Sequence, residues 1–270
     1  MPELPEVETT RLGLVARVVG HRIRDVVVRD RRLRWPVPED LAEHLRGARV
    51  REIRRRGKYL LFDCGKGHLL VHLGMSGSLT VVPPDRPVRR HDHVDLVLDT
   101  GDIVRLNDPR RFGAVLWVRD PAGHALLEGL GPEPFDEVFG GEYLHRASRG
   151  RRVPVKQFLM DSRVVTGIGN IYANEALFAA RIHPARAAGR ISRSRFDCLT
   201  REVRATLTRA LAAGGSTLRD FVGSDGRPGY FQQQYAVYGR ADQPCPACGA
   251  AVRATRHAGR ATFHCAACQR

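Results

Sequence analysis

The stretch HVDLVLDTGDIVRLND, residues 93–108, predicts a β-hairpin and with it the fold of the first half of the chain. Two apolar-rich runs flank DTGD, residues 99–102, which is a typical hairpin signal. Short alternating or apolar runs of the same kind lie on both sides, at 22–30, 49–57, 58–65, 68–75, 78–82 and 113–119. Strands at this spacing, joined by polar connectors, predict an antiparallel sandwich or barrel.

A helix is expected ahead of these strands. Pro5 suits the first position of a helix, and Glu6 and Glu8 would complement the positive end of its dipole. Apolar residues recur at helical spacing through residues 7–20, and Gly20 is suited to the position just after the last turn.

The pattern changes after about residue 120. GPEPFDEVFGGEY, residues 131–143, is rich in glycine, proline and acidic residues and indicates a linker. The later periodicity is helical, in stretches that begin at residues 154, 169 and 194. We therefore expect four parts, with the bounds 1–130 for a β domain, 131–150 for a linker, 151–238 for a helical domain and 239–270 for a ribbon. GSDGRPGY, residues 223–230, is expected to be a mobile loop.

Four of the six cysteines lie in two C-x2-C pairs near the end of the chain: Cys245, Cys248, Cys265 and Cys268. This spacing predicts a ribbon in which four thiolates bind one structural zinc ion. Two disulfides are the alternative, and they are disfavoured in a reducing compartment. His264 is a possible substitute ligand that we expect to lie outside the coordination shell.

The composition indicates a nucleic-acid-binding protein. The chain of 270 residues has 44 lysine and arginine residues against 29 acidic ones, a formal charge of +15. The basic residues cluster at 31–34, 54–58 and 146–152. The sign of the charge does not distinguish DNA from RNA or an anionic membrane. No apolar run approaches the roughly 20 residues of a membrane span, and no signal-type region is present, so a cytoplasmic protein is expected.

The N-terminus offers a nucleophile if Met1 is removed, because Pro2 then carries a free secondary amine. An α-amino group titrates near pH 8, so an appreciable fraction is nucleophilic at neutral pH. Its attack on an aldehyde-level carbon gives a cationic iminium that favours elimination at the neighbouring carbon. Glu3 is placed to act as a general acid or base, and Lys58 to hold a phosphate. Lys58 is one of only three lysines among the 44 basic residues, and the rest are arginine. A lysine at this position indicates a need for a group that, unlike arginine, can release a proton.

The sequence resembles the formamidopyrimidine-DNA glycosylases, which are bifunctional repair enzymes for oxidised purines. The resemblance runs from residue 2 to the last residue, in order, through the segments PELPEVET, RRGKYLL, HLGMSGSL, HDHVDL, DPRRFGA, GPEP, GIGNIYANEALF, SDGRPGY and ATFHCAACQR. It implies a multidomain α+β protein. Its parts are an N-terminal antiparallel β-sandwich flanked by a helix, a helical domain with a helix–two-turn–helix motif and a lesion-capping loop, and a zinc ribbon. It also implies a monomer that binds damaged double-stranded DNA.

The resemblance implies four catalytic residues. Pro2 attacks C1′ of the damaged nucleotide and forms a Schiff base, and Glu3 protonates the opening sugar. Lys58 is a proton donor for β-elimination. Arg260, in the ribbon, assists δ-elimination and grips the phosphates that flank the lesion.

The resemblance also implies DNA contacts, at His91, Arg110, Arg151 and Asn170. Arg151 departs from the family pattern, which usually has a lysine at this position. The wedge that fills the gap left by an everted base is expected at Met75, Arg110 and Phe112. Packing in the core is the alternative for Met75 and Phe112, although Gly74, Ser76 and Gly77 favour an exposed loop at Met75.

Two other functions compete with this interpretation. The first is an endonuclease VIII-like glycosylase for oxidised pyrimidines. Leu4 and the HDHVD and SDGRPGY segments favour the purine branch of the superfamily instead. The second is a non-catalytic zinc-ribbon DNA-binding module, which leaves Pro2, Glu3 and Lys58 unexplained.

Overall fold

The computed structural model describes residues 1–216 and 231–270, which pack into two compact units. Unit 1 comprises Met1–Glu128 and a segment that starts at Ala213, and unit 2 comprises Gly129–Ala212 and Phe231–Arg270. The expected loop at 223–230 lies outside the described residues. No helix in the described ranges is both long and apolar enough to cross a bilayer.

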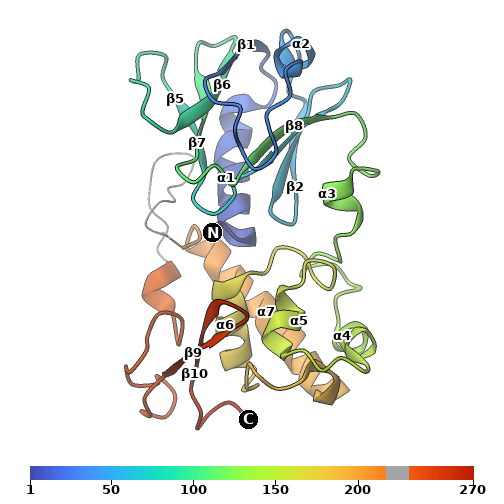
Figure 1. The fold of residues 1–270 in the computed structure, drawn as a ribbon, viewed down its shortest axis with the longest axis vertical. Helices are drawn as coiled ribbons and strands as arrows, with labels where there is room; N and C mark the ends of the chain where they lie inside the picture. The colour runs from blue at the N-terminus through green and yellow to red at the C-terminus, as the bar shows by residue number, and fades with distance from the viewer. Residues whose placement is uncertain (217–230) are drawn as a thin grey trace. The chain divides into compact units, whose positions relative to one another are not determined.

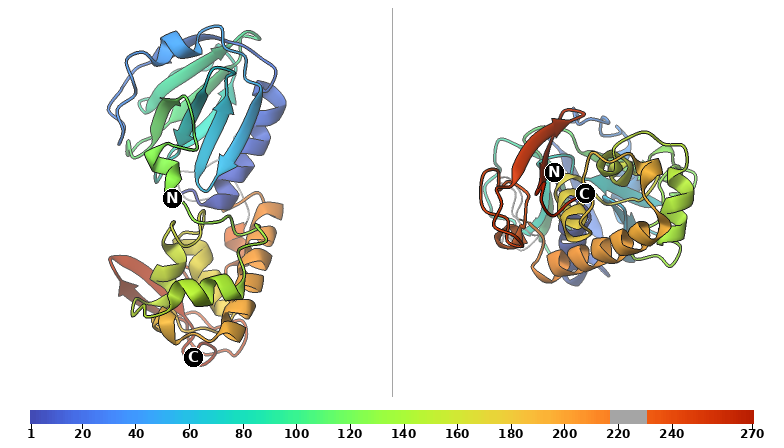
Figure 2. Two further views of the ribbon diagram at one scale, coloured as in Figure 1. Left: turned by 90° about the vertical axis from the view of Figure 1, so that its right-hand side faces the viewer. Right: turned by 90° about the horizontal axis from the view of Figure 1, so that it is seen from below.

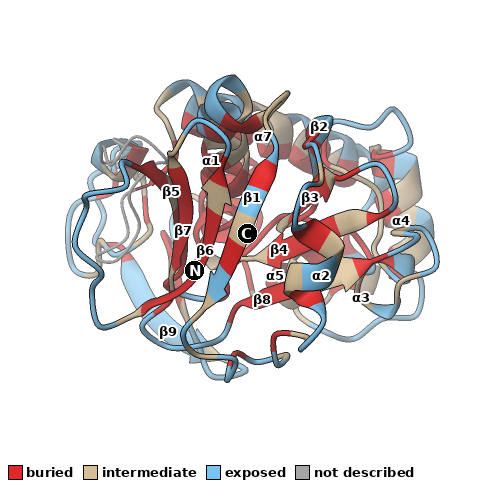
Figure 3. Cartoon of the chain, turned by 90° about the horizontal axis from the view of Figure 1, so that it is seen from above, coloured by how far each residue is buried: buried red, intermediate tan, exposed pale blue. Residues whose placement is uncertain are grey.

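The strands of unit 1 form two antiparallel sheets of four strands each (Figure 1). The first sheet has the order β1-β6-β7-β5, with the bounds Ile23–Val28, Asp92–Leu98, Ile103–Asn107 and Ser78–Val82. The second has the order β2-β3-β4-β8, with the bounds Glu52–Arg56, Tyr59–Asp63, His68–His72 and Ala114–Val118. Both sheets contribute side chains to one hydrophobic core, and their strands are largely buried (Figure 3). The predicted β-sandwich is confirmed.

The hairpin predicted from residues 93–108 is formed by β6 and β7. Leu96 lies opposite Val104 in the antiparallel register. The turn closes where the backbone N–H of Leu98 donates to the carbonyl of Asp102 at 2.8 Å. Gly101 has a φ of +91°, which explains the glycine in this turn.

Helix α1, Leu4–Val18, packs against β2 and β3 of one sheet and β5 of the other (Figure 2). It buries Val7, Leu14 and Val18 on its apolar face, as the spacing predicts. Gly20 follows its end with a φ of +90°, a conformation that favours glycine.

Two short helices of unit 1 are not apparent in the sequence. They are α2, Leu41–Leu45, and α3, Ala125–Glu128. Neither is long enough to show a helical repeat of apolar residues.

Unit 2 is built mainly from helices. Its α-helices are α4, Gly141–Ser148, α5, Val155–Met160, α6, Asn170–Ala179, and α7, Arg193–Ala212. The long α7 packs against α4 and α6, and α5 packs against α6. Two 3-10 turns, Ala188–Arg190 and Phe231–Gln234, complete the helical part. The helices expected after residue 150 are therefore present.

The segment 131–150, which we expected to be a linker, contains α4 and belongs to unit 2. Arg204 on α7 holds it by donating to the carbonyls of Pro134 at 2.9 Å and Phe139 at 2.6 Å. A Cβ atom on Gly141 would overlap Asp197 of α7, so this glycine allows close packing. The bounds of the four expected parts stay a prediction.

The end of the chain forms a small hairpin of β9, Arg253–His257, and β10, Arg260–His264. Strand β10 contacts α6. The ribbon of unit 2 is thus packed on the helices rather than standing alone.

Candidate functional site

Pro2 and Glu3 are buried at the start of α1, although terminal residues commonly fray. Glu6, which is fully buried, explains why they are ordered. Its Oε2 accepts the backbone N–H of Glu3 at 2.8 Å, and its Oε1 accepts the backbone N–H of Ser216 at 2.8 Å. The sequence indicated only a helix-dipole role for Glu6, whereas the structure makes it the anchor of the N-terminus.

The N-terminal amine is surrounded by charged groups of unit 1. Its pKa is lowered from the ordinary value of 8.0, first because burial disfavours the ammonium form. Glu3 and Glu6 oppose this shift, and Lys58 and Arg110 reinforce it. Of the predicted site residues, Glu3, Lys58 and Arg110 therefore act electrostatically on the amine that precedes Pro2.

Lys58 lies in the two-residue turn between β2 and β3, next to Gly57, whose φ is +57°. One ion pair ties this hairpin to α1, and a second pair within α1 shares the same carboxylate. Arg55 donates to Glu8 at 3.0 Å and to the carbonyl of Gly57 at 3.0 Å, and Arg11 pairs with Glu8 at 2.7 Å. Burial raises the pKa of Glu8, but the bonds and charges of Arg11 and Arg55 outweigh burial, so its pKa is below the ordinary value.

The three predicted wedge residues lie on two touching loops of unit 1. Met75 and Phe112 are each 40% exposed, so neither is a core residue. The loops approach so closely that a Cβ atom on Gly74 would lie 2.5 Å from the carbonyl carbon of Phe112. The guanidinium carbon of Arg110 lies 4.8 Å from the centre of the Phe112 ring. The structure therefore places the three residues on adjoining loops, with Met75 and Phe112 both exposed.

Asp108 shapes the loop that carries Arg110 and Phe112. Its buried Oδ2 accepts the backbone N–H of Gly113 at 2.8 Å, and burial raises its pKa. The backbone N–H of Asp108 donates to the carbonyl of His91 at 2.9 Å, which places His91 beside the same loop. Predicted DNA-contact residues from three segments of unit 1 thus lie near one another.

In unit 2, Arg260 is the exposed first residue of β10. Lys156, which is 2% exposed, donates to the carbonyl of Ala261 at 2.7 Å and to Oγ1 of Thr262 at 2.8 Å. Asn170, at the start of α6, donates to the same Ala261 carbonyl at 3.1 Å. Arg260 and Asn170 are therefore joined through the β10 backbone.

Two further side chains of α6 hold the ribbon and the segment that leads into it, and neither role was predicted from the sequence. Oδ1 of Asn174 accepts the backbone N–H of Phe263 at 2.9 Å. The buried carboxylate of Glu175 accepts backbone N–H groups of Ala236 at 2.8 Å and Val237 at 3.0 Å. Lys156 is different, because the scarcity of lysine in the chain already sets it apart.

Arg151 lies apart from the Asn170 and Arg260 pair. It is exposed ahead of α5, and its guanidinium carbon lies 5.6 Å from the centre of the Phe158 ring. It lines a cavity of about 470 Å³ with Arg152 and Arg190. These basic residues make this part of unit 2 suited to an anion.

The four cysteines of the ribbon come together as predicted, with their sulfur atoms all within 4.8 Å of one another. The Sγ atoms of Cys245 and Cys268 lie 3.9 Å apart, and those of Cys248 and Cys265 lie 3.5 Å apart. Tetrahedral thiolates at a Zn–S distance of about 2.3 Å would be about 3.8 Å apart, so the donor set fits such an ion. His264 is not part of this group.

Comparison with known families matches two models in succession. The formamidopyrimidine-DNA glycosylase N-terminal domain matches residues 1–115, and the H2TH domain of the same enzymes matches residues 130–222. The two matches together account for most of the chain.

Curated relatives and solved structures agree with these matches. The formamidopyrimidine-DNA glycosylases of Stutzerimonas stutzeri and Methylococcus capsulatus are each 56% identical, with complete coverage of both chains. The MutM (Fpg) protein of Thermus thermophilus has a TM-score of 0.89 at 42% identity, covering 99% of this chain and 98% of that one. A Lactococcus lactis Fpg mutant in complex with Fapy-dG-containing DNA has a TM-score of 0.92 at 32% identity, covering 99% of each chain.

A two-sheet sandwich with an N-terminal helix, an H2TH domain and four clustered cysteines define a class of multidomain DNA glycosylases. These observations confirm the predicted fold and enzyme class, and they exclude a non-catalytic zinc-ribbon module. The chain belongs to the formamidopyrimidine-DNA glycosylase family.

Proposed function

We propose that this enzyme acts in base excision repair, where it excises oxidised purines from duplex DNA and then cleaves the abasic strand. The observation that carries the proposal is the buried start of the chain, where Glu6 holds the backbone next to Pro2 and where Lys58 and Arg110 act electrostatically on the amine of Met1. Removal of Met1 frees the secondary amine of Pro2 in this environment, and an α-amino group is partly unprotonated, and hence nucleophilic, at neutral pH. Its substrate is chromosomal DNA, so we place the activity in the cytoplasm.

After removal of Met1, the Pro2 nitrogen attacks C1′ of the damaged nucleotide. The bond from C1′ to the base breaks, and the base leaves with the bonding electrons and gains a proton. Glu3 protonates the ring oxygen O4′ as the C1′–O4′ bond opens, and the Pro2 nitrogen loses its proton. The product is a C1′ iminium. Glu3 is suited to this role because its neighbour Glu6 fixes its backbone.

The iminium makes the C2′ proton acidic, so its loss expels the 3′-phosphate in a β-elimination. Lys58 acts here as the proton donor, at a hairpin tip that Arg55 and Glu8 hold against α1. Loss of the C4′ proton then expels the 5′-phosphate in a δ-elimination, which Arg260 assists. Hydrolysis of the Schiff base releases the sugar fragment and restores Pro2.

The remaining predicted residues bind the DNA. We assign phosphate contacts to His91, Arg151 and Asn170, and we assign the wedge to Met75, Arg110 and Phe112. The exposure of Met75 and Phe112 supports this, since an apolar side chain can offset the few kcal/mol lost when a base is everted.

We infer that the ion in the ribbon is zinc. Four thiolates in two C-x2-C pairs are the donor set of structural zinc sites, which leave no open position for substrate. The ion would stabilise the ribbon, residues 239–270, which carries Arg260. It takes no part in bond breaking.

Excision from two duplexes tests the substrate class. We expect single-turnover release of 8-oxoguanine opposite cytosine to be faster than release of thymine glycol opposite adenine. The pyrimidine alternative has some support, because a Lactococcus lactis Fpg was solved with DNA containing an oxidised pyrimidine. Faster release of thymine glycol would favour that alternative and contradict the proposal.

A further inference from the structure

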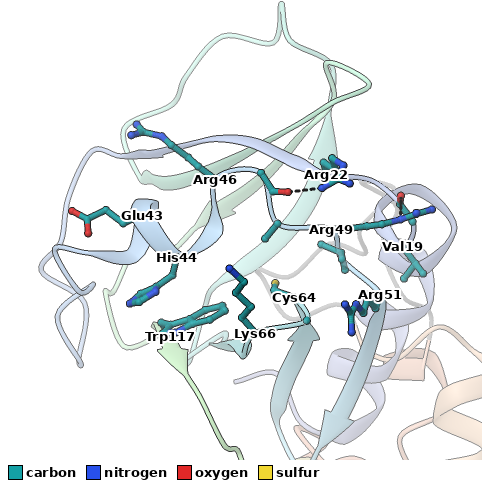
Figure 4. A pocket seen from close by; sticks show the side chains of 15 residues that line it. Val19, Arg22, Glu43, His44, Arg46, Arg49, Arg51, Cys64, Lys66 and Trp117 are labelled. Carbon is teal, nitrogen blue, oxygen red and sulfur yellow. Dashed lines mark hydrogen bonds between the residues drawn. The ribbon is translucent and has the colours of Figure 1, made fainter.

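Unit 1 contains a polar cavity of about 930 Å³ that the proposed reaction does not use. It lies beyond the C-terminal end of α1, where Val19 and Gly20 form part of its wall. Helix α1 has 15 residues, which at about 1.5 Å per residue separates this end from Pro2 by about 22 Å. The cavity is therefore distinct from the proposed catalytic centre, and Figure 4 shows the side chains that line it.

Five basic side chains line the cavity: Arg22, Arg46, Arg49, Arg51 and Lys66. They come from three different turns, which follow α1, α2 and β3. All five are exposed, so a ligand can reach them. In Figure 4 their side chains surround the opening, with the ammonium group of Lys66 near the middle of the view.

These cations have few counterions. Arg46 pairs with Asp25 at 2.9 Å, but no carboxylate of the described chain pairs with Arg22, Arg49, Arg51 or Lys66. The single acidic residue of the lining, Glu43, is exposed on α2. The cavity therefore concentrates positive charge that the described protein does not neutralise.

The cavity is preformed by backbone hydrogen bonds between the turns. Gly20 and Val50 are linked at 2.8 Å, and Gly47 donates to Ile23 at 2.7 Å. The third turn is fixed by a bond of 2.9 Å from Cys64 to Gly67. A ligand would meet turns that are already in place, which reduces the entropic cost of binding.

Two of the guanidinium groups are oriented by glycine turns. Arg22 donates to the carbonyl of Gly47 at 2.8 Å, and Arg49 donates to the carbonyl of Gly20 at 2.8 Å. Gly65, with a φ of +85°, lets the Arg51 guanidinium approach, because a Cβ atom there would lie 2.9 Å from its Nη2. The basic groups are thus held in defined positions, unlike a flexible charged surface.

We propose that this cavity binds closely spaced phosphate groups. One carboxylate would leave most of the positive charge unneutralised, whereas a chain of phosphates supplies several charges within a few ångströms. Guanidinium groups also match phosphate oxygens through paired N–H donors. The phosphates come from one of two sources, which are the backbone of a second DNA segment and a free nucleoside polyphosphate.

Trp117 in the wall of the cavity provides a direct probe. Its ring stacks on His44 at 5.0 Å with an interplanar angle of 9°. The chain has two tryptophans, so Trp35→Phe leaves Trp117 as the sole indole. In this background, inorganic tripolyphosphate should change the Trp117 fluorescence in a saturable way.

Charge reversal locates the binding. Arg51→Glu with Lys66→Glu should weaken tripolyphosphate binding at least tenfold. The matched control is Arg24→Glu with Arg201→Glu, which changes the net charge equally at exposed residues outside the cavity and should alter binding less than threefold. Circular dichroism should show both variants folded.

Two further titrations identify the source of the phosphates. In protein already saturated with a duplex carrying a tetrahydrofuran abasic analogue, displacement of tripolyphosphate by a second, undamaged duplex indicates DNA. Displacement by ATP alone indicates a free nucleotide, and either result supports the site. The proposal is overturned by the absence of a saturable response, by equal weakening in the control variant, or by a glutamate peptide that competes equally at equal charge.

Discussion

At the scale of single residues, burial changes the pKa of the N-terminal amine and therefore its reactivity as a nucleophile. With Met1 in place, the pKa of this amine lies below 8.0, chiefly because burial disfavours its charged form. We expect the same packing to lower the pKa of the Pro2 amine that replaces it. A lowered pKa means that the nucleophilic, neutral form persists to lower pH, and protonation removes it only as the pH falls through the shifted value. We therefore expect the reactivity of the amine to depend on the packing around Pro2 as well as on the proline itself.

This predicts the pH dependence of Schiff-base formation. On a pre-formed abasic site, the single-turnover rate of borohydride trapping should rise with pH and level off, with a midpoint below 8. A proline-initiated peptide of the first ten residues should titrate near the ordinary value and serves as the control. A midpoint at or above 8 for the enzyme would contradict the predicted shift.

At the scale of elements, the proposed wedge depends on two loops that meet at Gly74. Gly74→Ala would place a methyl group 2.5 Å from the Phe112 carbonyl carbon, and its φ of +62° is unfavourable for alanine. We expect excision of 8-oxoguanine to slow at least tenfold while cleavage of a pre-formed abasic site changes little, because that site needs no base eversion.

Gly101→Ala is the matched control for Gly74→Ala. Gly101 also has a positive φ, of +91°, but nothing lies within 4 Å of its added methyl group. The control should lose stability without separating the two activities. Equal slowing of both activities in Gly74→Ala would show that the two loops do not position a wedge.

Lys156 on α5 holds the backbone of β10, so we expect Lys156→Met to weaken the contact between these two elements. The change removes charged hydrogen bonds to Ala261 and Thr262, each typically worth about 1.5–3 kcal/mol. We expect lower thermal stability and weaker δ-elimination, because the backbone next to Arg260 loses its support. Lys66→Met, at an exposed lysine, should leave both unchanged. A fully active and stable Lys156→Met would refute this role.

The sequence predicted the regular elements better than the contacts between them. The hairpin at 93–108 and the helix ending at Gly20 follow from residue patterns that local geometry imposes. The helix α4 could not be predicted in this way, because a glycine such as Gly141 is typical of a linker. Only the structure shows that this glycine allows close packing against Asp197. Glu6 and Asn174 act on backbone groups far along the chain, so no local pattern could indicate their roles.

At the scale of the whole molecule, the charge of +15 predicts that DNA affinity depends strongly on salt. Each neutralised phosphate should contribute about −0.9 to the log–log slope. Arg151→Ala should reduce the magnitude of that slope by about one and weaken all sequences alike, while Arg201→Ala, on α7, should not. Fluorescence anisotropy at several salt concentrations measures this. An unchanged slope for Arg151→Ala would exclude a phosphate contact there.

We propose that the chain presents the N-terminal amine of Pro2 to damaged DNA as the nucleophile. Borohydride reduction of the enzyme on a duplex with 8-oxoguanine opposite cytosine, followed by mass mapping, tests it most directly. We expect a covalent adduct on Pro2 and no adduct when Met1 is retained. An adduct on Lys58, or normal trapping with Met1 in place, would contradict it.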